Sequence, residues 1–160
     1  MFNLSQEAEL LRKVPMFSKL EPSKLKLLAF TSESLTFEDG EVLCHIGEPA
    51  DCAFVIMSGE VSIMVETNEA EEVGFVLGSN ELIGEMAVIS NAPRSATVRA
   101  KGEAVVMRIS DEAFLKLLRE NSEIALYVMR TLSQRLAATS ERFQQAQAKL
   151  ARYESGQITT

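Results

Sequence analysis

Residues 84–98 read Gly84-Glu85-Met86-Ala87-Val88-Ile89-Ser90-Asn91-Ala92-Pro93-Arg94-Ser95-Ala96-Thr97-Val98. The stretch places a carboxylate, Glu85, nine positions before a guanidinium, Arg94. Backbone N–H groups at the start of a short helix can face a negative charge, and an arginine can add a two-pronged grip on phosphate oxygens. Glu85 would repel phosphate, so we expect it to accept hydrogen bonds from a neutral group such as a sugar hydroxyl. The stretch therefore predicts a nucleotide site.

The amino-acid sequence of this stretch also resembles a motif of a known protein family. Its two parts are Gly84-Glu85-Met86-Ala87 and Pro93-Arg94-Ser95-Ala96. They resemble the phosphate-binding cassette of the cyclic nucleotide-binding domain family, which runs Gly-Glu-apolar-Ala, a short turn, and then Arg, a small residue and Ala. The alternative is a surface turn with an incidental Glu–Arg pair.

The resemblance implies a role for each ligand-binding residue. Glu85 and the Gly84 backbone would take the ribose 2′-hydroxyl. Arg94, the backbones of Ala87 and Ser95 and the Ser95 hydroxyl would hold the cyclic phosphate, with Met86 in the same stretch.

Short strand-like runs lie on both sides of the cassette. They are 34–37, 42–46, 53–57, 61–65, 73–77, 82–83, 96–100 and 104–109. Turn formers separate them, for example Ser58-Gly59-Glu60. Many short strands at regular spacing predict a mainly β fold with flanking helices, an antiparallel jelly-roll barrel whose mouth fits one small ligand.

Helical patterns flank the strands. Residues 5–14 predict a short helix that Pro15 ends, and Leu25, Leu27, Leu28 and Phe30 predict a second one packed into the core. Asp111 can cap a helix over 112–119.

The last predicted helix, from about 123 to 153, contains no Gly or Pro. Its seam alternates steps of four and three: Ala125, Met129, Leu132, Leu136, Thr139, Phe143, Ala146, Leu150 and Tyr153. Such a seam is typical of a coiled coil. We expect a parallel homodimer through residues 125–153, because a helix packed only on its own barrel would leave Phe143 and Leu150 bare.

One seam position, Thr139, is polar, and Ser140 follows it. From Arg94 onward the resemblance narrows to bacterial regulators of the catabolite activator type. In those proteins a Thr-Ser pair on the long helix reads adenine, with the Ser from the other subunit. The resemblance therefore implies cyclic AMP, bound across a dimer interface, and Arg135 one turn earlier can approach it. Cyclic GMP is the alternative ligand, because Ser95 could serve a guanine.

Composition excludes several other classes. The net charge of −7 does not suit a nucleic-acid backbone as partner. Cys44, Cys52 and His45 are too few for a disulfide framework or a metal site. No apolar run reaches membrane-spanning length, and the amino terminus is acidic, unlike a signal peptide. We expect a cytoplasmic protein with no metal and no membrane contact.

These patterns predict a barrel domain over 1–120, a dimerisation helix over 121–154 and a disordered tail over 155–160. The tail is too short for a DNA-reading module. The chain is then a stand-alone sensor or the regulatory piece of a transcription factor, enzyme or channel. No catalytic constellation is found, and a phosphodiesterase would need a metal-binding His/Asp cluster. We therefore expect a non-enzymatic sensor that couples nucleotide binding to rearrangement of the helix and acts on an unknown downstream protein.

Overall fold

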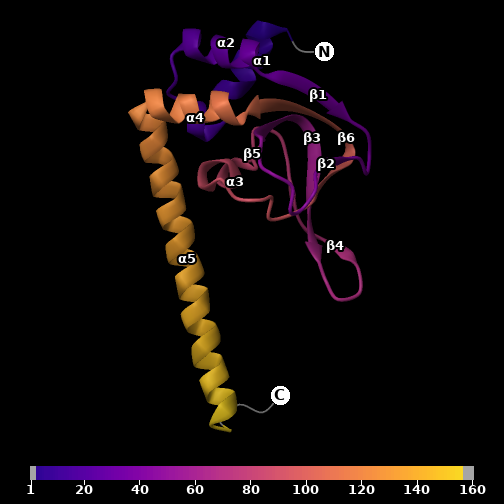
Figure 1. The fold of residues 1–160 in the computed structure, drawn as a ribbon, viewed down its shortest axis with the longest axis vertical. Coiled ribbons are helices and arrows are strands. Elements are labelled where there is room, and N and C mark those ends of the chain that lie inside the picture. The colour runs from indigo at the N-terminus through magenta and orange to yellow at the C-terminus, as the bar shows by residue number, and fades with distance from the viewer. Residues whose placement is uncertain (1–2, 157–160) are drawn as a thin grey trace. The chain divides into compact units, whose positions relative to one another are not determined.

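The computed structural model describes residues 3–156 (Figure 1). Three helical segments open the chain: α1 (Leu4–Arg12), the 3-10 helix η1 (Pro15–Phe17) and α2 (Pro22–Thr31). Asn3 caps the start of α1. Its side chain accepts from the Gln6 N–H, and the Gln6 side chain accepts from the Asn3 N–H. The predicted N-terminal helices are therefore present, and the first ends before Pro15.

Six strands form one antiparallel sheet. They are β1 (Glu33–Phe37), β2 (Val42–Cys44), β3 (Cys52–Glu66), β4 (Glu71–Leu77), β5 (Leu82–Ile83) and β6 (Val98–Ser110). The order is β1-β6-β3-β4, with β2 paired to β6 and β5 paired to β3. The sheet with its flanking helices confirms the predicted jelly-roll class.

Two of the strands are longer than the sequence predicted. The runs 53–57 and 61–65 form one strand, β3, and the runs 96–100 and 104–109 are joined in β6. Gly59 does not end a strand; it sits in an irregularity where the β3–β6 register shifts. A Cβ on Gly59 would lie 2.3 Å from the Glu103 carbonyl oxygen, so the glycine permits close approach of the two strands. The predicted turn at 58–60 is therefore wrong.

The barrel core lies between β3, β5 and β6. Its buried residues are Cys52, Phe54, Ile56, Val61, Ile83, Val98, Ala100, Ala104 and Val106. They alternate along β3 as Cys52, Phe54 and Ile56, which is the period expected of one face of a strand. This packing fixes the start of β3 firmly inside the barrel.

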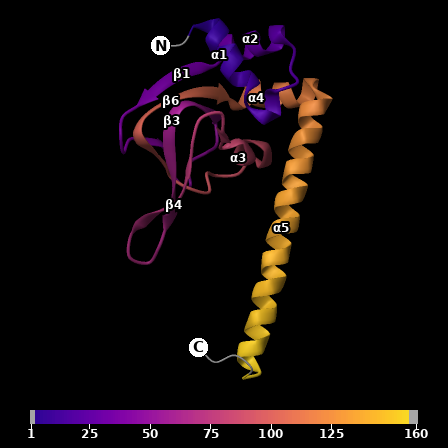
Figure 2. The same cartoon turned by 180° about the vertical axis from the view of Figure 1, so that it is seen from behind.

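Helices cover one end of the barrel. In Figures 1 and 2, α1, α2 and α4 (Asp111–Glu120) gather at that end, and the hairpin of β3 and β4 extends from the opposite end. Leu25 and Leu28 are buried, but Leu27 and Phe30 are 60% and 75% exposed. The expectation that all four pack into the core is wrong for these two, because they lie on the outer side of α2.

A second compact unit begins at Asn121. It consists of α5 (Ser122–Glu154), a single helix of 33 residues followed by a turn at Ser155 and Gly156. The helix confirms the predicted span to within one residue at each end. Residues 157–160 of the expected tail lie outside the described part of the chain.

Candidate functional site

The cassette residues form a short helix between two left-handed residues. Gly84, with φ +81°, precedes α3 (Glu85–Ser90), and Asn91, with φ +51°, follows it. The chain then turns at Pro93, which makes an isolated β-bridge with Pro49. The segment is thus fixed against neighbouring backbone at its C-terminal end.

Backbone hydrogen bonds hold Arg94 against the turn after β2. The Arg94 N–H donates to the Glu48 carbonyl at 2.8 Å, and the Gly47 N–H donates to the Arg94 carbonyl at 2.8 Å. These paired bonds fix the Cα of Arg94, so the direction of its side chain is set by the fold.

The Arg94 side chain points into the protein and is buried, with 5% of the residue exposed. Nη1 donates to the Gly84 carbonyl at 3.1 Å. Nη2 donates to the carbonyl oxygen and, at 3.3 Å, to the sulfur of Cys52. The guanidinium carbon also lies 5.9 Å from the centroid of the Phe54 ring. One guanidinium therefore connects the first residue of β3 with the residue that precedes α3.

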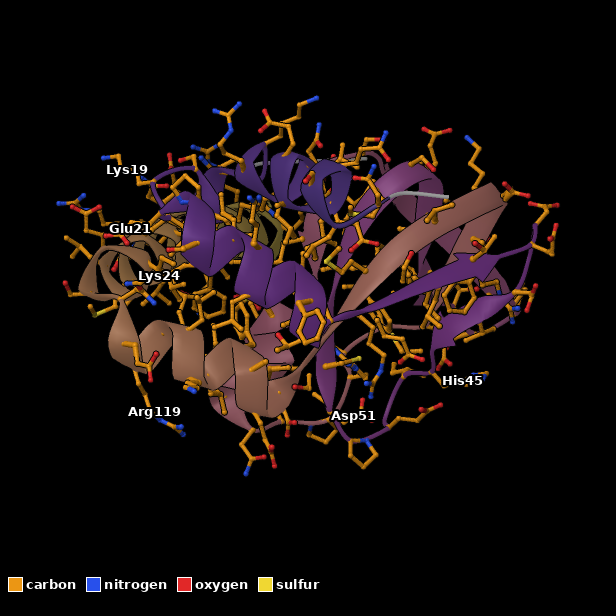
Figure 3. The ribbon with its side chains drawn as sticks, turned by 90° about the horizontal axis from the view of Figure 1, so that it is seen from above. Lys19, Glu21, Lys24, His45, Asp51 and Arg119 are labelled. Carbon is orange, nitrogen blue, oxygen red and sulfur yellow. The ribbon has the colours of Figure 1, made fainter. Side chains whose placement is uncertain are left out.

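The ion pair of this buried charge with Asp51 is long and faces solvent. The Asp51 carboxylate lies 3.9 Å from Nη2, and the Asp51 side chain is 68% exposed. Asp51, labelled in Figure 3, also pairs with Arg108 at 3.0 Å. Two backbone carbonyls accept directly from the guanidinium, and an anion reaching it there would gain a strong, weakly screened interaction.

The geometry at position 84 accepts only glycine. Its φ lies in the left-handed region, and a Cβ there would be 2.3 Å from Nη1 of Arg94. The glycine therefore serves the turn and the close approach of the arginine together.

The other predicted barrel residues share the segment. Glu85 begins α3 and is partly buried, as is Ala87, while Met86 and Ser95 are exposed. The Ala87 carbonyl accepts from the Ala92 N–H at 3.0 Å, which closes the turn before Arg94. The structure thus places all six predicted cassette residues on one segment, 84–95; their contacts with a ligand remain predictions.

The sequence did not indicate Cys52 as a neighbour of Arg94. The two residues are 42 positions apart, and their contact arises from the packing of β3 beside the cassette. Burial raises the pKa of the Cys52 thiol to about 11, against opposing effects of Arg108 and Arg94. Cys52 is therefore a neutral thiol near pH 7. His45, by contrast, is exposed at the surface (Figure 3).

Comparison with known proteins decides the family. The profile of the cyclic nucleotide-binding domain matches residues 34–121, which include the cassette and most of the barrel. The chain belongs to the cyclic nucleotide-binding domain family. The match confirms the family that the cassette sequence indicated. Residues 34–121 are a regulatory-type domain for cyclic nucleotides.

Relatives of the domain are parts of several kinds of protein. A cyclic nucleotide-gated potassium channel from Mesorhizobium japonicum is 35% identical over 132 residues, 82% of this chain and 36% of the channel. A cAMP-dependent protein kinase regulatory subunit from Blastocladiella emersonii is 32% identical over 115 residues, 71% of this chain and 28% of that subunit. The chain therefore spans about a third of the curated relatives it matches.

Solved structures include a bacterial regulator. The sensor domain of the transcriptional regulator DNR from Pseudomonas aeruginosa has a TM-score of 0.76 and 27% identity, over 83% of this chain and 90% of that one. This similarity agrees with the resemblance to bacterial regulators seen from Arg94 onward.

The remaining predicted residues of the cyclic nucleotide site lie on α5, in the second unit. Arg135, Thr139 and Ser140 are exposed, and the Thr139 hydroxyl donates to the Arg135 carbonyl of its own helix at 2.8 Å. The three residues occupy two successive turns of one helix. Their part in base recognition stays a prediction.

None of the helices in residues 3–156 combines the length and apolar character that crossing a membrane requires. No group of three or more His, Cys, Asp or Glu side chains in this part of the chain is arranged to hold a metal ion.

Proposed function

We propose that this chain is a sensor for cyclic AMP and that Arg94 binds the cyclic phosphate. The observation that carries the proposal is the buried guanidinium, which donates to the Gly84 and Cys52 carbonyls and has a long ion pair with the exposed Asp51 carboxylate. A buried charge is costly unless it is paired, so a phosphate has much to gain there.

Adenine is the base that the chain favours. Thr139 and Ser140 offer hydroxyls that can both donate and accept, as the edge of adenine requires. A relative of this chain is a cAMP-dependent kinase regulatory subunit, which supports the same choice. Cyclic GMP is the competing ligand, and Ser95 is the residue that would serve it.

The helix α5 is proposed to pair with that of a second copy. Met129, Leu136, Phe143 and Leu150 recur every seven residues, and each is more than half exposed. Four large apolar side chains in one row would be covered by a partner helix with the same row. The occupant we propose is therefore a second copy of this chain.

Charges beside the seam favour parallel helices. With Met129 and Leu136 at heptad position a, position g holds Arg135, Arg142 and Lys149. An antiparallel pair would place these basic rows against each other, whereas a parallel pair places each g residue opposite an e residue of the partner. Arg135 would then face Ser140 of the partner subunit, and Lys149 would face Glu154 of the partner subunit.

Binding would act on the helix pair by shifting populations. A nucleotide held by Arg94 and touched by Thr139 and Ser140 binds most tightly to the arrangement in which all three reach it. It therefore stabilises that arrangement over others. In a longer protein, whatever follows α5 would respond to the change. The channel, kinase and regulator relatives support such a role as one part of a larger assembly.

The base assignment is tested by a paired substitution. Thr139→Ala with Ser140→Ala should narrow the preference for cyclic AMP over cyclic GMP, because the adenine loses its hydroxyl partners. Calorimetric titration of both nucleotides gives the ratio of the two dissociation constants. A double variant on another face of the same helix, Gln144→Ala with Gln145→Ala, is the control. An unchanged ratio in the Thr139/Ser140 variant would remove α5 from base recognition.

A further inference from the structure

The two terminal nitrogens of Arg94 differ in their acceptors. Nη2 donates to the carbonyl oxygen of Cys52 and to its sulfur at 3.3 Å, and the Asp51 carboxylate lies 3.9 Å away. Nη1 donates to the Gly84 carbonyl at 3.1 Å. The contacts of the guanidinium are therefore concentrated on Nη2.

This concentration matters because of the shape of the guanidinium. It can grip two oxygens of a phosphate along the edge formed by Nε and Nη2, or along the edge formed by Nη1 and Nη2. Nη2 belongs to both edges. A two-pronged grip on phosphate therefore competes with the acceptors that Nη2 already has.

The acceptors of Nη2 differ in strength. The Cys52 carbonyl belongs to β3, which is paired with β5 and β6, and it is a strong acceptor fixed by the fold. The sulfur is a weak acceptor. Its thiol stays neutral near pH 7, because burial raises the pKa of Cys52 to about 11. Asp51 is farther away and is shared with Arg108. The sulfur is the contact that a phosphate oxygen can most easily replace.

We propose that Cys52 is a positioning residue that holds Nη2 of Arg94 weakly and yields it to the phosphate, and that the acceptor strength at position 52 thereby sets nucleotide affinity. This inference rests on the proposed function. Cys52 aligns the guanidinium before a nucleotide arrives, at small cost to binding. A stronger acceptor in its place would retain Nη2 and oppose the ligand.

Two substitutions separate this role from packing. Cys52→Ser offers a hydroxyl oxygen, which is a stronger acceptor than sulfur, and Cys52→Ala offers no side-chain acceptor. Both remove the sulfur from the core at a residue that is 2% exposed, so both should lower stability. Their effects on affinity should have opposite signs. Against wild type, we expect Cys52→Ser to bind cyclic AMP roughly three- to tenfold more weakly and Cys52→Ala to bind it more tightly.

The measurement is calorimetric titration of the full chain with cyclic AMP and with its two phosphorothioate diastereomers, each of which replaces one exocyclic phosphate oxygen by sulfur. The ratio of the dissociation constants of the two diastereomers depends on where Arg94 lies relative to the two exocyclic oxygens. A general loosening of the core would not shift this ratio selectively. We expect this ratio to move toward one in Cys52→Ser. Cys44→Ser and Cys44→Ala are matched controls, because the Cys44 thiol donates to the Ala96 carbonyl, whereas the Cys52 sulfur accepts from Arg94.

Each outcome is decisive. Opposite shifts in the two Cys52 variants, with Cys44 variants like wild type, support the inference. Equal affinities, weakening in both variants or tighter binding by Cys52→Ser overturn it and leave the proposed function standing. A wild-type chain that binds no cyclic nucleotide overturns the proposed function, and this inference with it.

Discussion

At the scale of single residues, the site depends on the approach of Arg94 to two backbone carbonyls. Gly84 makes this approach possible because it has no Cβ, and its carbonyl then accepts from Nη1 at 3.1 Å. The sequence pattern placed Gly84 and Arg94 in one phosphate-binding segment, but it did not predict the contact between them. The inward direction of the arginine could not be predicted either, because it depends on Cys52, which only the folded barrel brings near.

Gly84→Ala should therefore impair both stability and binding. The left-handed φ of +81° costs a residue with a Cβ about 1–2 kcal/mol, and the new methyl group would displace Nη1 of Arg94. Denaturant unfolding and titration with cyclic AMP measure the two effects. Gly78→Ala is the control, since a Cβ there meets nothing within 4 Å and the residue is not in the left-handed region. A Gly84→Ala protein that binds like Gly78→Ala would show that Arg94 need not lie where we describe it.

At the scale of elements, the sequence predicted which segments are strands and helices better than where strands end. Gly59 was read as a turn because glycine with positive φ is common in turns. In the structure it has φ +83° within β3, where β6 bulges opposite it. A glycine alone does not distinguish a turn from a bulge, since both need the same backbone freedom. The long helix was predictable almost to the residue because nothing in its sequence interrupts it.

Leu136→Glu should convert a dimer into a monomer. Leu136 is 67% exposed on α5 and lies in the middle of the proposed seam, so in a parallel pair two glutamates would face each other in an apolar row. Light scattering of the purified protein measures the mass. Gln144→Glu adds the same charge outside the seam and should stay dimeric. If Leu136→Glu remains a dimer, the copies associate through another surface.

At the scale of the whole molecule, the chain is acidic yet is proposed to bind an anion. The net charge of −7 opposes the approach of a nucleotide at long range. Affinity must therefore come from close contacts, and the buried guanidinium of Arg94 is the contact that can supply it. The chain divides into two compact units: one carries the cassette, and the other carries the proposed seam and the predicted base-reading residues.

The most direct test of this account is a titration with cyclic AMP of three proteins: wild type, Arg94→Ala and Arg99→Ala. Arg99 is a matched control, because it pairs with Glu71 at 2.7 Å on the outside of the barrel. Circular dichroism confirms that each variant is folded. Removing the partner of a buried phosphate should weaken binding by about 2 kcal/mol or more, roughly 30-fold, in Arg94→Ala alone. A folded Arg94→Ala protein that binds cyclic AMP as tightly as Arg99→Ala would contradict the account.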